Sequence, residues 1–388
     1  MLDTSAAARE IFHAALKAVD PAESVRRHVG LLREKYRTGR FDRLLVAGFG
    51  KAAMPMAEAL EAEIGDLVSN GVIITNHGHS GTHELHRIRA YEAGHPIPDE
   101  AGMHATERLL TLLEPTDDRT LVVLPISGGG SALFVSPWPG IPLADKQETT
   151  RLLLRAGAEI GEMNTVRKHL SRVKGGRLAE LLHPATVVSL ILSDVIGDRL
   201  DTIASGPTSP DPTSFADALA VLDRYGLRNT VPAPVAAHLE RGARGLVPDT
   251  TLHGARCFSS VENLIIGSSR LALEGARARA EQLGFATKIT SAVVAGEARE
   301  AGRQLARSVS VAARKKHDRP LCLISGGETT VTVTGTGKGG RNMELALAFA
   351  MDIDGMPGIT LLSAGTDGND GPTDAAGALV DGSTVEDA

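Results

Sequence analysis

Short apolar runs separated by helix-length segments restrict the fold of this chain more than any other feature. Such runs are RLLVAG (43–48), RTLVVLPI (119–126) and ATVVSLILS (185–193). Continuous apolar strands are typical of parallel sheets, because helices cover both faces of such sheets. The alternation of strand runs with helical segments therefore predicts an α/β fold with a mostly parallel sheet.

The length of 388 residues favours two domains, because one hydrophobic core rarely organises so long a chain. Polar connectors over about 213–255 mark the expected boundary. We expect a Rossmann-like α/β domain over 1–250 and a second α/β domain over 251–388. Further strands are predicted at 71–75, 262–267, 285–290, 321–324, 329–334 and from 358, and helices at 5–19, 21–35, 99–113, 143–160, 268–283, 296–315 and from Arg341.

Composition excludes several classes of function. The net charge of −6 and the aromatic content of 3% argue against a nucleic-acid partner, which needs a basic surface or stacking side chains. No apolar run reaches the length of about 18 residues that indicates a membrane span. The N-terminus does not resemble a signal peptide, and Cys257 and Cys322 lack paired spacing, so we expect free thiols in a cytoplasmic protein.

The stretch from Leu321 to Phe349 contains two glycine-rich turns. The first is SGGE, and the second carries four glycines between Gly335 and Gly340 before a predicted helix. Uncovered N–H groups at a helix N-terminus attract anions, and two cations stand at the same place. We expect an anion site here, with a flexible connection and solvated cations as the alternative. Its residues are Ser325, Gly326, Gly327, Glu328, Lys338, Gly339, Gly340, Arg341 and Asn342.

The first apolar run ends in a dinucleotide-type spacing of small residues, Gly48, Gly50 and Ala53. We count both glycines as nucleotide-binding candidates. The full fingerprint needs an acid about twenty positions on, at the end of the next strand, and this chain has Asn76 there. Lys51 stands in the first turn of the following helix, where a cation does not favour the helix. A bound phosphate or carboxylate explains Lys51, and a solvated lysine is the alternative.

A third glycine-rich turn follows the run 119–126 directly. Its residues are Ser127, Gly128, Gly129, Gly130 and Ser131. The turn should lie at the carboxyl edge of the sheet, where open α/β sheets bind ligands. Asp194 follows the run 185–193, a place suited to a general base or a magnesium ligand, with a turn-forming aspartate as the alternative. Asp367 lies in an acidic loop that fits magnesium carried with a nucleotide.

Two basic clusters have non-catalytic interpretations. Five cations occur within eleven residues, and a solvated helical face is one interpretation of such a run. They are Arg167, Lys168, Arg172, Lys174 and Arg177. Five loop histidines match no zinc spacing, so we expect solvated or hydrogen-bonded side chains. They are His77, His79, His83, His86 and His95.

Taken together, backbone cradles, isolated cations and acids beyond strand ends predict a nucleotide-dependent enzyme that acts on a small molecule. Phosphoryl transfer needs positioning and charge neutralisation, with magnesium on the phosphates and a carboxylate near the attacking hydroxyl. These residues alone do not identify the acceptor.

Eight ordered motifs extend over nearly the whole chain. They are GFGKAA (48–53), AGHPIPDE (93–100), PISGGGSAL (125–133), NTVRKHLSRVKGGRLA (164–179), LSDVIGD (192–198), ASGPTSPD (204–211), SGGETTVTVTGTGKGGRN (325–342) and SAGTDGNDGPTDAAG (363–377). In this order the motifs resemble the class II glycerate 2-kinases, whose C-terminal half is the MOFRL domain.

The resemblance implies an ATP- and magnesium-dependent phosphotransferase that acts on the 2-hydroxyl of D-glycerate, in a cleft between the two domains. The family's active-site lysine, arginine and an aspartate fall on Lys51, Arg341 and Asp194. We expect the two cations to neutralise phosphate or substrate carboxylate. We expect Asp194 to accept the hydroxyl proton and, with Asp367, to bind magnesium, while the glycine-rich turns cradle the phosphates.

The chain departs from the family pattern in two places. Met343 stands where the family usually has glutamine. The chain stops at Ala388, before the family's usual C-terminal strand, so we expect that element to be absent or not represented in this sequence. One alternative function is an NAD(P)-dependent hydroxypyruvate reductase, which the fingerprint spacing favours and the missing ribose acid opposes. A non-catalytic binder of phosphorylated metabolites is another, and a homodimer is left open.

Overall fold

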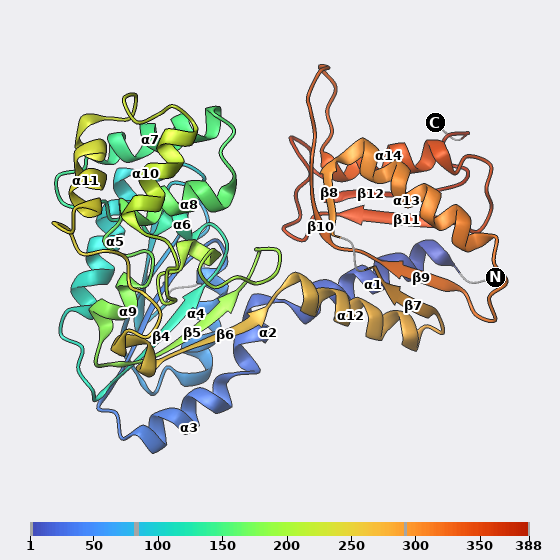
Figure 1. Ribbon diagram of the computed structural model, residues 1–388. Coiled ribbons are helices and arrows are strands. Elements are labelled where there is room, and N and C mark those ends of the chain that lie inside the picture. The colour runs from blue at the N-terminus through green and yellow to red at the C-terminus, as the bar shows by residue number, and fades with distance from the viewer. Residues whose placement is uncertain (1–2, 81–84, 291–292, 387–388) are drawn as a thin grey trace. The chain divides into compact units, whose positions relative to one another are not determined.

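The computed structural model describes residues 3–80, 85–290 and 293–386. It divides into a large unit, residues 21–268, and a small unit, residues 1–20 together with 269–388 (Figure 1). The boundary expected from the sequence, at residue 250, lies near the observed boundary at 268. The sequence interpretation assigned residues 1–20 to the first domain, whereas they belong to the small unit. No helix among the described residues is long and apolar enough to cross a membrane.

The large unit is built on one six-stranded sheet in which every paired strand runs parallel. The strands are β1 (Arg43–Phe49), β2 (Val68–Asn76), β3 (Ile88–Ala93), β4 (Thr120–Ile126), β5 (Thr186–Leu192) and β6 (Val261–Gly267). Their order is β3-β2-β1-β4-β5-β6, so the chain runs outward from β1 and then returns to its other side at β4. This order is that of the Rossmann fold and confirms the predicted fold class.

Helices cover both faces of this sheet, which explains why its strands are continuously apolar. On one face pack α2 (Pro21–Arg26), α3 (Val29–Gly39) and α4 (Ala53–Ile64), and on the other pack α5 (Glu100–Leu113) and α9 (Arg177–Leu182). A separate helical core is formed by α7 (Leu143–Arg155), α8 (Ile160–His169), α10 (Phe215–Arg224) and α11 (Ala233–Ala243).

Two predicted helices are interrupted. The helix expected over 21–35 divides into α2 and α3. A ring nitrogen of His28 donates a hydrogen bond to the carbonyl oxygen of Ser24 at 2.8 Å, so a side chain interrupts the backbone hydrogen bonds there. The helix expected over 143–160 ends with α7, because Gly157 adopts a left-handed φ of 78° before α8 begins. Both predictions of one continuous helix were therefore wrong.

The edge strand β3 was not predicted, since the sequence interpretation placed 76–95 in a loop. In the structure IRAYEA pairs parallel with β2. Only its two end residues, Ile88 and Ala93, are buried. A strand at a sheet edge is incompletely covered, so it lacks the continuous apolar run that identified its neighbours.

In the part of the small unit that the structure describes, there are three two-stranded sheets. Strand β7 pairs with β9 and β8 with β10 in parallel, and β11 pairs with β12 antiparallel. The elements of this unit are α1 (Thr4–Ala18), α12 (Ser269–Gln282), β7 (Ala286–Ile289), β8 (Val294–Glu297), α13 (Ala298–Ala313), β9 (Leu321–Ile324), β10 (Gly327–Thr330), α14 (Arg341–Asp352), β11 (Thr360–Ala364) and β12 (Gly377–Asp381). Helix α1 buries Ala7 and Ile11 against Ala272 and Ala276 of α12. This apolar contact attaches the first residues of the chain to its last third.

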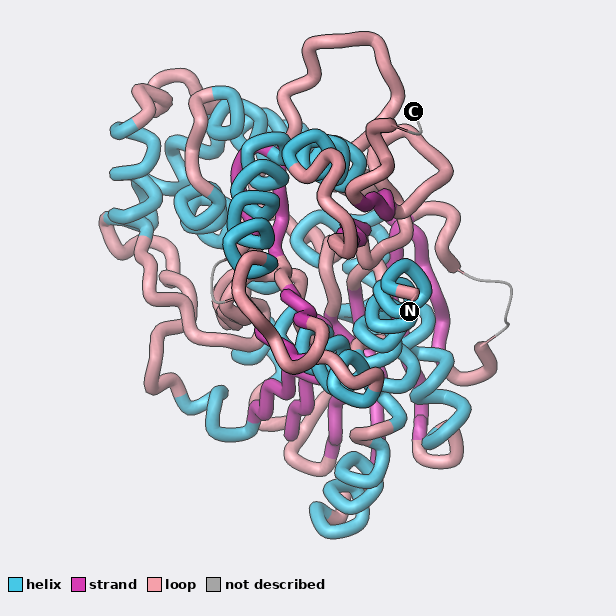
Figure 2. The backbone as a smooth tube through the Cα atoms, turned by 90° about the vertical axis from the view of Figure 1, so that its right-hand side faces the viewer, coloured by secondary structure: helices cyan, strands magenta, loops and turns pink. Residues whose placement is uncertain are grey.

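Strand β10 is shorter than the predicted strand 329–334. Thr332 donates hydrogen bonds from its N–H and its hydroxyl to the carboxylate of Glu297, both at 3.1 Å. A side chain thus replaces a strand partner at this point. Residues 332–338 are exposed, and 331–340 form a long loop without helix or strand (Figure 2).

Candidate active site

The carboxyl ends of β1, β4 and β5 are adjacent in the large unit, and the strand order reverses between β1 and β4. Open α/β sheets bind ligands outside the carboxyl ends of the strands at such a reversal. Lys51 follows β1, the SGGGS turn (127–131) follows β4, and Asp194 follows β5. Candidates from three distant parts of the sequence therefore reach one edge of one sheet.

Hydrogen bonds close the turn between β1 and α4 against the SGGGS turn. The N–H of Lys51 donates to the carbonyl oxygen of Gly128 at 2.8 Å, and the N–H of Ala52 donates to the Ser127 hydroxyl at 2.9 Å. The N–H groups of Lys51 and Ala52, just before α4, are thus used inside the protein. The Lys51 side chain, not the backbone of this turn, remains available to a ligand.

Gly48 and Gly50 allow this close approach of the two turns. A Cβ on Gly48 would lie 2.4 Å from the ring of Pro125, and one on Gly50 would lie 2.2 Å from the Ser127 hydroxyl oxygen. Gly50 also has a φ of 134°, which side-chain-bearing residues rarely adopt. The structure therefore gives these two nucleotide-binding candidates a packing role.

The SGGGS turn itself leaves N–H groups open. Those of Gly128 and Gly129 donate to no acceptor in the part of the chain that the structure describes. Gly129 has a φ of 83° and precedes the short helix α6 (Gly130–Leu133). Successive N–H groups around a left-handed residue form a concave site that attracts anions. This turn has the geometry of an anion cradle, and phosphate binding at it stays a prediction.

Side chains from the ends of three strands surround the two glycines. A Cβ on Gly128 would lie 2.1 Å from Oδ2 of Asp194. A Cβ on Gly129 would lie 3.2 Å from Nε2 of His95 and 3.2 Å from Cγ of Lys51. The structure thus brings Lys51 and Asp194 together, as the sequence interpretation expected, and adds a histidine.

His95 follows β3 and was not selected as a site residue, because it was grouped with the loop histidines. Its signal in the sequence was its place in AGHPIPDE, one of the motifs that carry the family resemblance. Although the His95 side chain is exposed, partial desolvation by its neighbours, followed by the positive charge of Lys51, lowers its pKa below 6.5. The imidazole is therefore neutral near pH 7 and can accept or donate one hydrogen bond at each nitrogen.

A buried lysine supports the SGGGS turn. Lys174 is 3% exposed, and its Nζ donates to the carbonyl oxygen of Gly130 at 2.9 Å. The same ammonium lies 5.0 Å from the ring centroid of Phe134 and 5.5 Å from that of Phe49. Burial and then the charges of Arg167 and other cations lower the pKa of Lys174 well below its usual value. The hydrogen bond from Nζ to Gly130 fixes the turn from inside the protein.

Two further polar residues near the turn were not selected from the sequence. The hydroxyls of Ser131 and Ser205 share a hydrogen bond of 2.8 Å, and the Ser205 hydroxyl also donates to Oδ1 of Asn164 at 3.3 Å. Ala204 and Ser205 both adopt left-handed backbone conformations, with φ of 50° and 62°. Such backbone strain concentrates at binding sites, where the surrounding structure maintains it.

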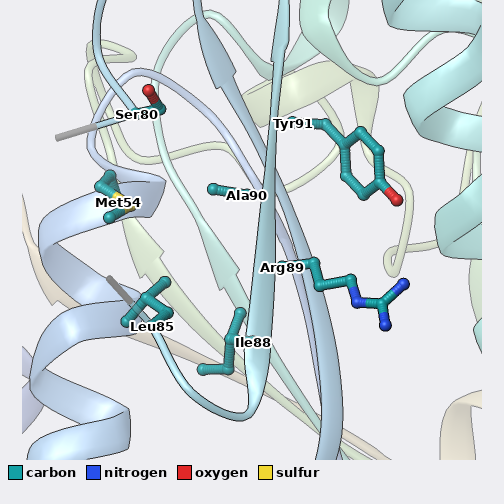
Figure 3. Close-up of a pocket in the computed structure, with 7 residues that line it drawn as sticks. All are labelled: Met54, Ser80, Leu85, Ile88, Arg89, Ala90 and Tyr91. Atoms are coloured by element: carbon teal, nitrogen blue, oxygen red, sulfur yellow. The ribbon is translucent and has the colours of Figure 1, made fainter. Parts of the chain in front are cut away.

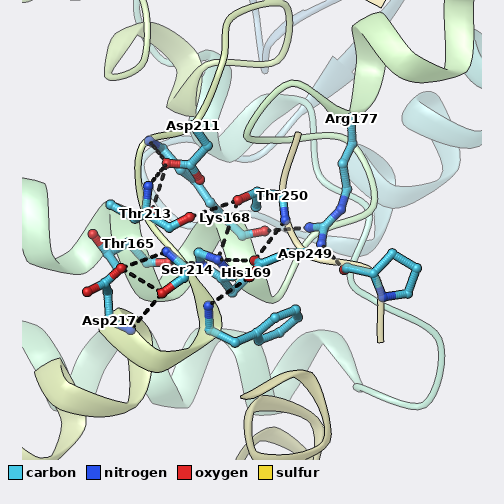
Figure 4. Close-up of polar contacts among 12 residues, drawn as sticks. Thr165, Lys168, His169, Arg177, Asp211, Thr213, Ser214, Asp217, Asp249 and Thr250 are labelled. Atoms are coloured by element: carbon cyan, nitrogen blue, oxygen red, sulfur yellow. Dashed lines mark hydrogen bonds and ion pairs between the residues drawn. The ribbon is translucent and has the colours of Figure 1, made fainter. Parts of the chain in front are cut away.

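The run of five cations is not a solvated face, and that interpretation is wrong for its three most buried members. Lys168, Lys174 and Arg177 are 3%, 3% and 6% exposed. Lys168 pairs with Asp211 at 3.2 Å, and Arg177 donates to three carbonyl oxygens (Figure 4). Arg172 is exposed. Because each buried cation has its own partners, the run joins α8 and α9 to the rest of the large unit.

In the small unit, a carboxylate of the chain itself caps the N-terminus of α14. Asp370 is 1% exposed and accepts the N–H of Asn342 at 2.9 Å, the N–H of Met343 at 2.8 Å and the Asn342 amide nitrogen at 3.1 Å. Negative charge at this end also suits the helix dipole. The helix amides that the sequence interpretation gave to a ligand anion are therefore already occupied. Gly340 permits this contact, since a Cβ there would lie 2.4 Å from Asp370.

The SGGE turn connects β9 to β10. The hydroxyl of Ser325 shares a hydrogen bond of 2.9 Å with that of Thr290. A Cβ on Gly327 would lie 2.0 Å from the carbonyl oxygen of Val294 on the paired strand β8, and Gly326 is also closely packed. These contacts give both glycines a role in strand packing.

The charged candidates of the small unit are more exposed. Nη1 of Arg341 lies 2.6 Å from Oε1 of Glu328, so its guanidinium already has an acidic partner. Lys338 and Asp367 are exposed, and Gly339 borders open space. Arg341 and Glu328 are thus brought together, while their contribution to a phosphate site stays a prediction.

Metal ligands are sparse. Within the described ranges, no group of three or more His, Cys, Asp or Glu side chains is placed to hold a metal ion. His77 bonds to Asp99 at 2.8 Å, which agrees with the expectation of hydrogen-bonded histidines, and His83 lies outside the described residues. Asp194 and Asp367 belong to different units.

A hollow of about 370 Å³ lies between α4 and β3. Its lining residues are Met54, Ser80, Leu85, Ile88, Arg89, Ala90 and Tyr91 (Figure 3). None of Lys51, His95 or Asp194 contributes to it. It is therefore separate from the site at the carboxyl edge of the sheet.

Comparison with known proteins covers most of the chain. Residues 7–240 match a domain of unknown function, DUF4147, and residues 321–388 match the MOFRL family. A D-glycerate 2-kinase of Thermotoga maritima is 44% identical over 97% of this chain and 86% of its own. A protein of Agrobacterium vitis, provisionally named a hydroxypyruvate reductase, is 41% identical over 96% and 82% of the two chains.

A solved structure shows the same fold. The crystal structure of a glycerate kinase from Thermotoga maritima matches with a TM-score of 0.86 at 42% identity. The match covers 99% of this chain and 88% of that one.

Proposed function

The chain belongs to the glycerate 2-kinase (MOFRL) family, and from this membership we propose that it transfers the γ-phosphate of ATP to the 2-hydroxyl of D-glycerate. The product is 2-phosphoglycerate. One observation carries the proposal: the open N–H groups of Gly128 and Gly129 lie beside Lys51 and Asp194 at the strand-order reversal. Phosphoryl transfer depends on this combination of an anion cradle, a cation and a carboxylate.

In this proposal each group at the sheet edge has one task. The N–H groups of the SGGGS turn hold phosphate oxygens, and the ammonium of Lys51 neutralises charge that develops during transfer. Asp194 accepts the proton of the attacking hydroxyl, because it is the carboxylate next to the turn. His95, with its lowered pKa, supplies a neutral hydrogen-bonding group beside Lys51.

The small unit supplies further groups in the proposal. Arg341 and Lys338 would add positive charge toward the triphosphate, and the SGGE turn and the loop before α14 would contact the nucleotide. The pairing of Arg341 with Glu328 requires the guanidinium to exchange partners, or to present its remaining N–H groups, when phosphate binds.

Magnesium fits the carboxylates that are present. This ion usually keeps several waters and binds proteins through one or two carboxylates together with substrate phosphates. Asp194 and Asp367 are exposed carboxylates, one in each unit, that would serve as such ligands. When bound, the ion would neutralise phosphate charge, as in other phosphotransferases.

The reductase alternative has two arguments in its favour, the dinucleotide-type spacing after β1 and the name of the Agrobacterium relative. Two contacts oppose it. The N–H groups of Lys51 and Ala52, which follow the dinucleotide-type glycines, already bond to the SGGGS turn. Strand β2 ends at Asn76, whose amide bonds to His79, so the ribose acid is not supplied there.

One pair of assays separates these functions. The protein is incubated with D-glycerate, MgCl₂ and ATP while ADP is followed, and then with hydroxypyruvate and NADH or NADPH while absorbance is followed. We expect ADP and 2-phosphoglycerate in equal amounts and no hydride consumption. Consumption of NAD(P)H without ADP formation would reject the kinase proposal in favour of the reductase. The proposal places this reaction in the cytoplasm, and a homodimer stays an open prediction.

A further inference from the structure

One cation of the run, Arg167, is only partly buried and has no acidic partner among the described residues. Lys168 is paired with Asp211, Lys174 with the carbonyl oxygen of Gly130, and Arg177 with three carbonyl oxygens. Arg172 is exposed to water. Arg167, on α8, forms one long hydrogen bond of 3.5 Å to Oδ1 of Asn164 and no ion pair with any described acid.

The surroundings of Arg167 are positive and partly dry. Burial lowers its pKa, and no acidic side chain offsets that burial. The ammonium of Lys146 donates to the carbonyl oxygen of Arg167 itself at 3.1 Å, and its pKa falls to about 7 through burial and the charge of Arg167. The pKa of Lys174 is lowered by burial and then by the charges of Arg167 and Lys146. Concentrated positive charge without acids is costly unless an anion compensates it.

A chain of polar contacts leads from Arg167 to the phosphate cradle. Oδ1 of Asn164 accepts from Arg167 and from the Ser205 hydroxyl, and the Ser205 hydroxyl bonds to that of Ser131 at 2.8 Å. Ser131 lies three residues beyond Gly128, whose neighbour is Asp194. The left-handed backbone at Ser205 holds its hydroxyl in this chain.

We infer that Arg167, positioned by Asn164 and Ser205, binds the carboxylate of the acceptor and thereby selects 2-hydroxy acids over neutral polyols. This inference rests on the proposed function. A guanidinium binds a carboxylate through two parallel hydrogen bonds, which fixes the plane of the acid. Because the hydroxyl-bearing carbon of a 2-hydroxy acid is bonded directly to the carboxylate carbon, the fixed acid presents its hydroxyl toward the SGGGS turn and Asp194.

The direct test is Arg167→Gln, with Arg172→Gln as the matched control on the same run of cations. Loss of a charge-assisted pair raises the KM for D-glycerate by about tenfold to a hundredfold. The KM for MgATP changes less than about threefold, because Arg167 acts on the acceptor. Arg172→Gln leaves both constants near those of the unchanged protein. Equal increases in both KM values would assign Arg167 a general structural role and overturn the inference.

A substrate that lacks the charge provides the second measurement. D-Glyceramide keeps the 2-hydroxyl and replaces the carboxylate with a neutral amide. In the unchanged protein, this replacement lowers kcat/KM strongly. In Arg167→Gln the loss of kcat/KM on going from D-glycerate to the amide is at least about tenfold smaller, because the guanidinium that binds the carboxylate is already absent. An unchanged penalty in the variant would show that another group recognises the carboxylate.

The two proposals fail in different ways. If the unchanged protein does not phosphorylate D-glycerate, the kinase proposal fails before any variant is made. If it does and Arg167→Gln keeps its KM and its discrimination against the amide, only the inference about Arg167 fails. Should Arg167→Gln not fold, Arg167→Lys keeps the charge without the planar fork, and the same amide comparison on that variant decides the question.

Discussion

Two turns of this protein, 127–131 in the large unit and 335–341 in the small unit, are both rich in glycine and differ in what their N–H groups bond to. In the first, the N–H groups of Gly128 and Gly129 have no acceptor among the described residues, and Lys51 lies alongside. In the second, the amides that begin α14 already bond to Asp370. Glycine content alone therefore does not identify a phosphate cradle.

The difference follows from where each turn lies in its fold. The SGGGS turn stands at the reversal of strand order in a parallel sheet, so its open side is surrounded by the ends of other strands and by the residues that follow them. The α14 turn meets its own acidic loop, 28 residues further along the chain. An internal carboxylate satisfies the helix amides there and stabilises the helix, as a ligand anion would otherwise do.

The strongest test of this comparison is Asp194→Asn. The amide keeps the shape of the side chain beside Gly128 and removes its ability to accept a proton. We expect kcat to fall by about 10²- to 10⁴-fold, the usual contribution of a general base, with little change in thermal stability. Steady-state ADP release measures the effect. Activity within about threefold of the unchanged protein would remove Asp194 from proton transfer.

Lys51→Ala tests the cation of the open turn. Removal of one group that stabilises a transition state typically costs about 10²- to 10³-fold in kcat, and we expect a loss in that range. Lys338→Ala is the variant to compare with it, because Lys338 is the exposed lysine of the closed turn and in the proposal only adds charge toward the triphosphate. We expect a much smaller loss there. Similar losses for the two lysines would mean that both turns act on phosphate and would erase the contrast between them.

Asp370→Asn tests the closed turn through stability. The substitution removes the charge that accepts two backbone N–H groups at a buried helix start. We expect the free energy of unfolding to fall by about 1–2 kcal/mol, as for the loss of a helix cap. Urea denaturation followed by circular dichroism measures it. Asp367→Asn, in the same loop and exposed, should change stability by less than about 0.5 kcal/mol.

The same contrast explains what the sequence could predict. Continuous apolar runs identified β1, β4 and β5, and the residues just beyond them, Lys51 and Asp194, were correctly placed at one sheet edge because parallel strands align their carboxyl ends. The edge strand β3 has no such run, so the strand was missed, and His95 just after it was not recognised as a neighbour of Lys51.

Other features depend on tertiary contacts that local patterns do not contain. The cap from Asp370 joins residues 28 positions apart, and the burial of Lys168 depends on Asp211, 43 positions away. A cation run looks the same in sequence whether its partners are water or buried carbonyl oxygens. Only the folded structure shows which groups these cations bond to, and so whether they are solvated or buried.

The smallest expected effect concerns His95 and reports directly on the geometry of the open site. Partial desolvation and then the charge of Lys51 lower its pKa below 6.5, while the charge of Asp194 acts in the opposite direction. NMR titration of the imidazole should therefore show the pKa rising in Lys51→Met and falling further in Asp194→Asn. If the pKa of His95 changes in neither variant, His95 does not lie close to Lys51 and Asp194.

The same shift gives a pH dependence with a definite sign. Because the pKa of His95 is lower in the folded protein than in the unfolded chain, the unfolded chain binds more protons between the two values. The contribution of His95 to stability is therefore fully present above about pH 6.5 and is lost as the pH falls from there toward the folded pKa. His95→Gln should reduce the decline in the free energy of unfolding between about pH 7.5 and pH 5, measured by urea titration. If the free energy of unfolding declines equally in the unchanged protein and in His95→Gln, the open turn does not change the pKa of this histidine. The surroundings of His95 would then resemble the solvated surface around Lys338 more than a binding site.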